Sequence, residues 1–173
     1  MTSFIELAKK RFSTRAFSDK PIEQEKLDLI IEAGRVAPTA CNNQPQKVYI
    51  VKSEAKRAAL AAVCPCTYNA PVVLAVGYDV TRAAKGKVTQ GDYDFGETDD
   101  AIVTTHMMLE AADLGVDSCY VGWFNSDEVV AALGLPGNVR VRALLPIGYK
   151  TEDFKPSPMH TKIRDISETV EEL

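Results

Sequence analysis

The sequence predicts a single mixed domain in which helices and strands alternate, and three observations support this fold class. The chain has 173 residues, of which 46% are hydrophobic, and this is enough to build one sizeable core. Segments with apolar residues at helical spacing alternate with short runs rich in β-branched residues. Residues 72–77 are apolar throughout, as is typical of a central strand covered on both faces. We therefore expect one domain over residues 1–173.

The first half of the chain is predicted to contain three helices and two strands. Ser3 and Glu6 have the spacing of a capping box, in which each side chain accepts a hydrogen bond from a free backbone N–H. A helix should therefore begin there and end near Arg11. The other expected elements are a helix between Pro21 and Pro38, a strand at 48–51, a helix from Ser53 to near Val63, and the strand at 72–77.

Residues 78–96 are predicted to form a long loop, because they turn polar and contain three glycines without an apolar period. Loops of this length in compact domains are often functional. Within residues 78–98, Tyr93, Asp94 and Phe95 could form an aromatic lid, or the segment could be a passive connection. The sequence leaves both interpretations open.

A long central helix is expected next, because Asp99 and Asp100 place negative charge where a helix N-terminus favours it. Its apolar pattern continues to a stop at Gly115. The apolar positions surround most of the circumference, which indicates burial between the sheet and another surface, such as a second subunit. The elements expected after it are a strand at 119–123, a helix from Ser126 to Gly134 and a half-exposed strand at 139–145.

Residues 150–173 are predicted to form an extended tail. Pro156 and Pro158 disfavour regular structure, and Asp165 or Ser167 should cap one last helical turn. A tail of this length needs a surface to lie on, and a partner subunit is one candidate.

The composition argues against several classes of protein. The net charge of −4 provides no broad basic field, so nucleic acid is not expected as a partner. The longest apolar run, residues 72–76, is too short to cross a membrane. The N-terminus lacks the regions of a secretory signal, and we expect a cytoplasmic protein. Cys41, Cys64, Cys66 and Cys119 should then be reduced thiols. The spacing of Cys64 and Cys66 matches neither a zinc knuckle nor a thioredoxin site, so no metal site is expected.

The segment Arg11-Phe12-Ser13-Thr14-Arg15 is a candidate anion site. Arg supplies a planar fork of donors and the hydroxyls add short neutral donors, as a phosphate requires. The alternative is a solvated basic helix end that complements the helix dipole, and the segment alone does not decide between them. Lys162 and Arg164 add cationic donors far along an otherwise acidic chain, and this favours the anion site.

The loop of residues 37–45 consists of small and amide side chains between a predicted helix and a predicted strand. Amides offer donors and acceptors to a planar polar heterocycle, and Pro38, Thr39 and Ala40 let the backbone come close to it. The loop could equally be an ordinary connection, and by itself it does not distinguish the two.

Taken in order, these motifs resemble the nitroreductase family of flavin enzymes. Members of that family typically read Arg-x-Ser-x-Arg, followed by Ala-Pro-Ser-x-x-Asn-x-Gln-Pro. The resemblance extends to the helix end at residues 111–115 and to residues 146–149 and 162–164. Residues 119–124, Cys-Tyr-Val-Gly-Trp-Phe, are similar to the family's Cys-Trp-Ile-Gly-x-Phe strand. Each motif is weak, but the ordered set covers essentially the whole chain and is specific.

The resemblance implies an α+β three-layer sandwich, with a mixed, mostly antiparallel sheet flanked by helices, that forms a homodimer with one FMN in each interfacial site. The N-terminal and C-terminal cations would hold the phosphate, the loop at residue 38 would come from the other subunit, and backbone groups of Val121 and Gly122 would face flavin N5. The implied cofactor-binding residues are Arg11, Phe12, Ser13, Arg15, Pro38, Thr39, Ala40, Asn42, Gln44, Tyr120, Val121, Gly122, Lys162 and Arg164.

The implied activity is NAD(P)H-dependent reduction of nitro, quinone or similar small-molecule acceptors, by ping-pong hydride transfer through flavin N5. The flavin carries the chemistry, so no catalytic side chain is expected, and His106 is interpreted as an interface histidine whose hydrogen bonds are satisfied. Two alternatives stay open: a flavin-binding redox protein without efficient turnover, and a dehalogenating or flavin-processing member of the same family. The chain departs from the family pattern at Thr39, Gln46 and Tyr120, which leaves acceptor preference open.

Overall fold

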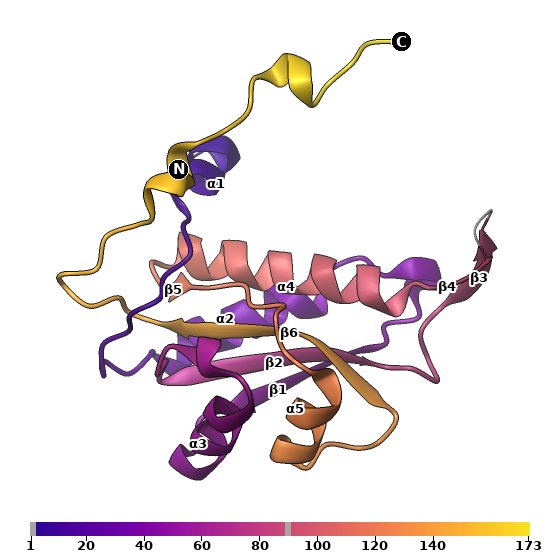
Figure 1. Cartoon of the computed structure of the whole chain (residues 1–173), viewed down its shortest axis with the longest axis horizontal. Coiled ribbons are helices and arrows are strands. Elements are labelled where there is room, and N and C mark those ends of the chain that lie inside the picture. Colours follow the sequence, from indigo (N-terminus) through magenta and orange to yellow (C-terminus); the bar gives the residue numbers. More distant parts are fainter. Residues whose placement is uncertain (1–2, 89–90) are drawn as a thin grey trace.

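A four-stranded antiparallel sheet forms the centre of the fold (Figure 1). The structure is a computed structural model that describes residues 3–88 and 91–173. Every residue of the second strand is buried, which confirms the predicted central strand. The strands lie in the order β1 (Gln46–Val51), β2 (Val72–Asp79), β6 (Val139–Gly148) and β5 (Asp117–Ser118).

Helices cover both faces of this sheet and give the predicted three-layer α+β sandwich (Figure 1). Consecutive strand residues point to opposite faces, and the packing follows this alternation. Val73 lies in one core cluster with residues of α3 and α5, whereas Leu74 lies in the other cluster with residues of α2 and α4. The bounds of these helices are α2 (Gln24–Arg35), α3 (Glu54–Val63), α4 (Gly96–Asp113) and α5 (Ser126–Leu133).

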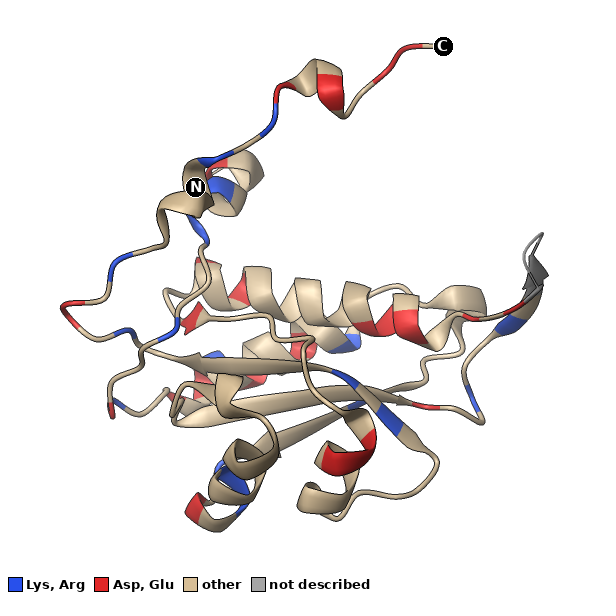
Figure 2. Ribbon diagram, viewed as in Figure 1, with Lys and Arg blue, Asp and Glu red and all other residues tan. Residues whose placement is uncertain are grey.

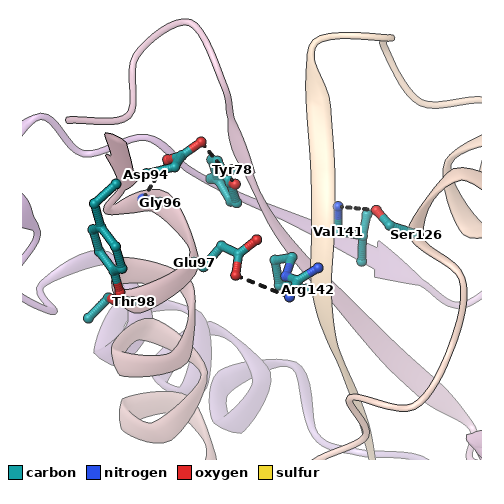
Figure 3. Close-up of polar contacts among 9 residues, drawn as sticks. Tyr78, Asp94, Gly96, Glu97, Thr98, Ser126, Val141 and Arg142 are labelled. Carbon is teal, nitrogen blue, oxygen red and sulfur yellow. Dashed lines mark hydrogen bonds and ion pairs between the residues drawn. The ribbon is translucent and has the colours of Figure 1, made fainter. Parts of the chain in front are cut away.

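A β-bulge interrupts the pairing of β2 with β6. Val76 is opposite Ala143 and Gly77 is opposite Val141, so Arg142 is the extra residue. A Cβ atom on Gly77 would lie 2.4 Å from the carbonyl oxygen of Arg140, and only glycine fits there without a shift of the backbone. The bulge aims Arg142 at the first turn of α4, where it pairs with Glu97 (Figure 3).

The prediction of a structureless loop at residues 78–96 is wrong. The segment contains a hairpin of β3 (Lys85–Val88) and β4 (Gly91–Asp94), which projects beyond the end of the sheet (Figure 1). The sequence did not predict these two strands, because they contain glycines and charged residues. A two-stranded hairpin away from the core does not need the alternating apolar residues by which a strand is recognised. The ring of Tyr93 packs edge-on against Phe95 at 4.7 Å, and its hydroxyl lies 2.6 Å from the hydroxyl of Thr98. The aromatic lid stays a prediction.

The long helix α4 begins earlier than predicted, at Gly96 instead of near Asp99. The Asp94 carboxylate accepts a 2.9 Å hydrogen bond from the backbone N–H of Gly96. A Cβ atom on Gly96 would lie 2.3 Å from the ring of Tyr78, so this glycine serves close packing. The predicted end of the helix at Gly115 is confirmed, since Gly115 has a left-handed φ of 71°.

The N-terminal helix and the part of the tail near His160 lie side by side, apart from the layers, and the C-terminus extends away from them (Figure 1). Helix α1 (Phe4–Lys10) begins with the predicted capping box, since Ser3 and Glu6 exchange both hydrogen bonds. The tail from residue 150 is largely extended and carries two short 3-10 turns, η3 (Pro158–Thr161) and η4 (Ile166–Glu168). Asp165 caps the second turn, as predicted. The packing of this tail on a partner subunit stays a prediction.

Within residues 3–88 and 91–173, no helix combines the length and the apolar character needed to cross a membrane.

Candidate functional site

The predicted anion segment lies beside the strand end that follows β5. The backbone N–H of Thr14 donates a 2.9 Å hydrogen bond to the carbonyl of Ser118, and Ser13 forms a parallel bridge with the same residue. The segments that contain Ser13 and Ser118, which are about a hundred positions apart in sequence, therefore lie side by side.

The Arg15 guanidinium influences the titration of two nearby groups, Tyr68 and Cys119. Burial raises the pKa of Tyr68, Cys66 adds to that shift, and Arg15 opposes it. Burial likewise raises the pKa of the Cys119 thiol, and the charges of Arg15 and Arg11 oppose that shift. Tyr68 has a left-handed backbone with φ 52°, a conformation that non-glycine residues adopt at a cost.

The C-terminal tail returns to the N-terminal helix. A ring nitrogen of His160 lies 3.1 Å from the carbonyl oxygen of Lys9, and the His160 ring is edge-on to Phe12 at 6.0 Å. A hollow of about 520 Å³ lies between the two segments, and Arg11, Thr161 and Ile163 are among its lining residues. The structure thus brings the sequence neighbours of Lys162 and Arg164 to Arg11.

The predicted phosphate-binding cations form no direct ion pair with a carboxylate among the described residues. Figure 2 shows Lys and Arg residues along the N-terminal segment and the tail, with Asp and Glu residues between them. The ion pairs in the described ranges are those of Lys26 with Glu23, Arg35 with Glu32 and Arg142 with Glu97. Arg11, Arg15, Lys162 and Arg164 take no part in them, so their charges are available to an anion.

The loop that contains Pro38, Thr39 and Ala40 lies elsewhere in the chain. The backbone N–H of Ala40 donates a 2.8 Å hydrogen bond to Oδ1 of Asp99, in the first turn of α4. The backbone N–H of Gln44 donates to the Thr39 hydroxyl at 3.0 Å, and the Gln44 side chain contacts the Asn42 side chain at 3.3 Å.

This loop is also strained. Three of its residues have left-handed φ values: Cys41 (54°), Asn42 (54°) and Gln44 (48°). Such conformations concentrate at functional sites, where the surrounding structure maintains them.

The anion segment and this loop lie at opposite ends of α4. Arg11 shares a hollow of about 200 Å³ with Ala112, near the helix C-terminus, whereas Ala40 is bonded to Asp99 near the N-terminus. Thirteen residues separate Asp99 from Ala112, which is about 20 Å along a helix that rises 1.5 Å per residue. One chain therefore does not bring its own loop at residue 38 to its own anion segment.

The strand end at residues 120–122 is fixed to the sheet by its middle residue. The N–H and the C=O of Val121 both bond to Leu144 of β6 at 2.9 Å, because the chain pairs with β6 there. The next residue, Gly122, is exposed, and the contact of these two residues with a flavin stays a prediction. Tyr120 is partly exposed, and Trp123 is 89% exposed.

Two acidic residues that the sequence assigned to a helix N-terminus are buried inside the protein. Asp99 is 2% exposed and Asp100 is fully buried. Neither oxygen of Asp100 has a hydrogen-bond partner among the described residues. Burial raises the pKa of Asp100 well above its usual range, and the charge of Arg142 only partly opposes this. The signal in the sequence was two adjacent acids at the start of an otherwise apolar helix.

His106 lies exposed on α4 of the single chain, and its expected place at an interface stays a prediction. A ring nitrogen of His106 lies 2.9 Å from the carbonyl oxygen of Ile102, one turn earlier in α4. Within the described part of the chain, no group of three or more His, Cys, Asp or Glu side chains is arranged to hold a metal ion.

Comparisons with known proteins identify the same fold and a family. The model of the family described as "Nitroreductase family" matches residues 8–68 and 64–149. A solved structure of a nitroreductase family protein from Clostridium difficile 630 is 32% identical, covers 98% of this chain and 97% of its own, and superimposes with a TM-score of 0.88.

Two more distant similarities cover most of the chain. An Archaeoglobus fulgidus protein, described as a candidate NADH dehydrogenase/NAD(P)H nitroreductase, is 26% identical over 157 residues, which is 88% of each chain. The structure of a candidate nitroreductase from Desulfovibrio desulfuricans in complex with FMN is 22% identical, with a TM-score of 0.82, and covers 100% of this chain and 98% of its own. The family match spans most of the residues, and the chain belongs to the nitroreductase family.

Proposed function

We propose that the protein is an FMN-dependent NAD(P)H oxidoreductase that reduces nitro, quinone or similar small-molecule acceptors in two alternating half-reactions. The observation that carries the proposal is that the tail returns to the N-terminal segment, so that four cations without an ion pair among the described residues come from two neighbouring segments: Arg11, Arg15, Lys162 and Arg164. The names of the two relatives, one with NAD(P)H and one with bound FMN, point in the same direction.

The residues present fit a flavin mononucleotide. A phosphate monoester carries nearly two negative charges at neutral pH and accepts several charge-assisted hydrogen bonds. Arg11, Arg15 and the Ser13 hydroxyl would supply donors from one end of the chain, and Lys162 and Arg164 from the other. The amides of Asn42 and Gln44 would bind the polar edge of the ring system.

We further propose that the site is shared between two copies of the chain. A flavin ring and its phosphate need both the anion segment and the loop at residue 38, and these lie at opposite ends of α4. A two-fold partner would bring its own loop to the anion segment of the first chain. The tail supports this, because Ile163 and Ile166 are 81% and 72% exposed, and a partner surface would cover them.

When bound, FMN supplies the hydride chemistry, accepting from a reduced nicotinamide and delivering to an oxidant. The protein's own residues would bind the cofactor and orient it. The cations fix the phosphate end, and the pairing of Val121 with Leu144 fixes the strand end whose exposed Gly122 would adjoin the reacting edge. Tyr120 and Trp123 would border the space in which nicotinamide and acceptor alternate.

The test is a visible absorption spectrum of the freshly purified protein, followed by anaerobic titration with NADH and with NADPH. We expect a yellow dimer whose flavin absorbance is bleached by at least one nicotinamide and restored by a quinone. A colourless protein that takes up no FMN would contradict the proposal.

A second candidate is a flavin-binding redox protein without efficient turnover. The observation that favours it is the buried Cys119 thiol, which directly follows Ser118, the bridge partner of Ser13. Bleaching by dithionite but by neither nicotinamide, with thiol reactivity that follows the flavin state, would select this candidate.

A further inference from the structure

The segment that leads into the β3–β4 hairpin concentrates positive charge that the proposed flavin site does not use. Residues 80–91 contain two lysines, one arginine and no acidic residue, in a chain whose net charge is −4. Figure 2 shows positive residues where the chain leaves the sheet and enters the hairpin. Arg82 and Lys85 are exposed, and neither takes part in an ion pair among the described residues. Their charges are therefore available to an anionic ligand.

A hollow of about 570 Å³ lies against the hairpin, and an aromatic ring borders it together with Lys85. The ring belongs to Tyr93, which is 41% exposed. It is held in place, because its hydroxyl lies 2.6 Å from the Thr98 hydroxyl and the ring packs edge-on against Phe95 at 4.7 Å. The hollow has the volume of a small-molecule site, and a fixed aromatic ring offers its face to a flat base.

Two acids, Asp92 and Asp94, also line the hollow. Asp94 is occupied within the protein, since its two oxygens accept hydrogen bonds from the backbone N–H of Gly96 and from the hydroxyl of Tyr78 (Figure 3). Asp92 is exposed, and its carboxylate can accept a hydrogen bond from a base amino group or a ribose hydroxyl. The hollow thus offers a cation, an aromatic ring and an acceptor, which suit the parts of a nucleotide.

The hairpin is joined to the loop that the proposed function places on the flavin. The Asn43 side chain donates a 3.0 Å hydrogen bond to the backbone carbonyl oxygen of Arg82. Asn43 lies between the two residues whose amides we assign to the ring system. A dinucleotide whose nicotinamide lies on that ring system would extend its adenosine end past this loop, toward the hairpin.

We propose that Arg82, Lys85 and Tyr93 form a hairpin surface that binds the adenosine 2′-phosphate end of NADPH, so that the enzyme prefers NADPH to NADH. The inference rests on the proposed function. The two reduced dinucleotides differ only by the 2′-phosphate, a monoester with nearly two negative charges at neutral pH. Arg82 and Lys85 would bind this phosphate through charge-assisted hydrogen bonds, and the ring of Tyr93 would stack on the adenine.

Isothermal titration calorimetry of the FMN-loaded protein tests the hairpin surface without turnover. The probes are adenosine 2′,5′-bisphosphate and 5′-AMP, which differ only by the 2′-phosphate. Bound FMN keeps both probes away from the cations assigned to the cofactor. We expect the bisphosphate to bind at least about tenfold more tightly than 5′-AMP, because charge-assisted phosphate contacts contribute at least that much.

Variants separate the two parts of the hairpin surface. Lys85→Ala and Arg82→Ala should each weaken the bisphosphate about tenfold and 5′-AMP less than about twofold. Tyr93→Ala should weaken both probes about tenfold, because both contain adenine. Lys52→Ala removes a positive charge from an exposed position outside the hairpin and should change neither affinity.

Anaerobic stopped-flow mixing with each nicotinamide tests the same residues in the reaction. In Lys85→Ala the apparent dissociation constant for NADPH should rise about tenfold. The constant for NADH should change less than about twofold, because NADH lacks the group that Lys85 would bind. Lys85→Arg keeps the charge and should restore most of the preference for NADPH. A merely structural role of Lys85 would weaken both dinucleotides equally.

Equal affinity of the wild type for the two probes would overturn the proposal. So would equal losses for NADPH and NADH in Lys85→Ala and Arg82→Ala, or bleaching by NADPH in a protein that binds no bisphosphate. Failure of the proposed function gives a different result: the protein is then colourless, or neither nicotinamide bleaches its flavin, whereas the calorimetry still reports on the hairpin surface.

Discussion

The backbone N–H of Ala40 donates a 2.8 Å hydrogen bond to the buried Oδ1 of Asp99. This bond fastens the strained loop, with left-handed Cys41 and Asn42, to the first turn of α4. The loop that we assign to a partner's flavin is thus held by an acid near one end of the central helix.

Replacing Asp99 with Ala should release that loop. The half-buried Ala40 N–H would lose its acceptor, and a hydrogen bond of this kind contributes about 0.5–1.5 kcal/mol. Urea unfolding of the FMN-free protein measures the loss, and Asp99→Asn, which keeps an acceptor oxygen, is the matched control. Equal stability of Asp99→Ala and wild type would show that other contacts hold the loop.

The bulge should depend on Gly77. A Cβ atom there would meet the Arg140 carbonyl oxygen at 2.4 Å and Cα of Val141 at 2.9 Å, so Gly77→Ala must shift the backbone. Overpacking of this kind costs about 1–3 kcal/mol, and thermal unfolding should register it. Gly137→Ala is the control, because nothing lies within 4 Å of a Cβ atom there; a similar loss in both variants would refute the steric argument.

Arg11→Ala and Arg164→Ala should each weaken FMN retention. Each removes a charge-assisted phosphate contact worth about 1.5–3 kcal/mol, which equilibrium titration of the apoprotein with FMN can measure. Lys155→Ala removes the same charge from an exposed position of the same tail and should leave affinity unchanged. Unaltered affinity in both arginine variants would place the phosphate elsewhere.

Asp100 should make the protein less stable as pH rises. Burial raises its pKa in the folded state above the unfolded value, so folding favours the protonated form. That stabilisation is complete below the unfolded pKa, near 3.9, and is lost as pH rises toward the raised pKa. Asp100→Asn should therefore gain melting temperature over wild type at pH 8 more than at pH 5. A constant difference between the two melting curves would contradict the raised pKa.

The exposed apolar residues of the tail should matter for assembly. Asp substitutions at Ile163 and Ile166 place charge where we expect a partner surface, and burying an unpaired charge is costly. Sedimentation velocity should show the shift from dimer to monomer. Lys155→Asp introduces the same side chain at an exposed polar position and should stay dimeric. A dimer that persists in the doubly substituted protein would indicate that the tail lies free.

The fold could be predicted from the sequence where burial requires a recognisable pattern of apolar residues. β2 is apolar throughout and was recognised as central, and the capping box at Ser3 located the first helix. The β3–β4 hairpin was missed because it lies away from the core, where hydrophobic alternation is not required. The start of α4 was misplaced because Gly96, which looks like a loop residue, is there to make room for Tyr78.

The cations of the candidate site could be picked out from the sequence, because Arg11, Arg15 and Arg164 are local positive charges in a chain that is acidic as a whole. The backbone bonds of Val121 to Leu144 could not be foreseen, because they depend on which strand lies beside that segment. The burial of Asp100 was hidden for a related reason. Adjacent acids at a helix start look solvated until the packing of β6 against α4 is known.

The separation of the anion segment and the loop at residue 38 along α4 has a genetic consequence for a shared site. A chain damaged at Arg11 still contributes an intact loop, and a chain damaged in the loop still contributes intact cations. When the two defective chains are co-expressed, each mixed dimer should regain one sound site from two broken halves. Such complementation between inactive alleles is possible only when each binding site is built from residues of both polypeptides.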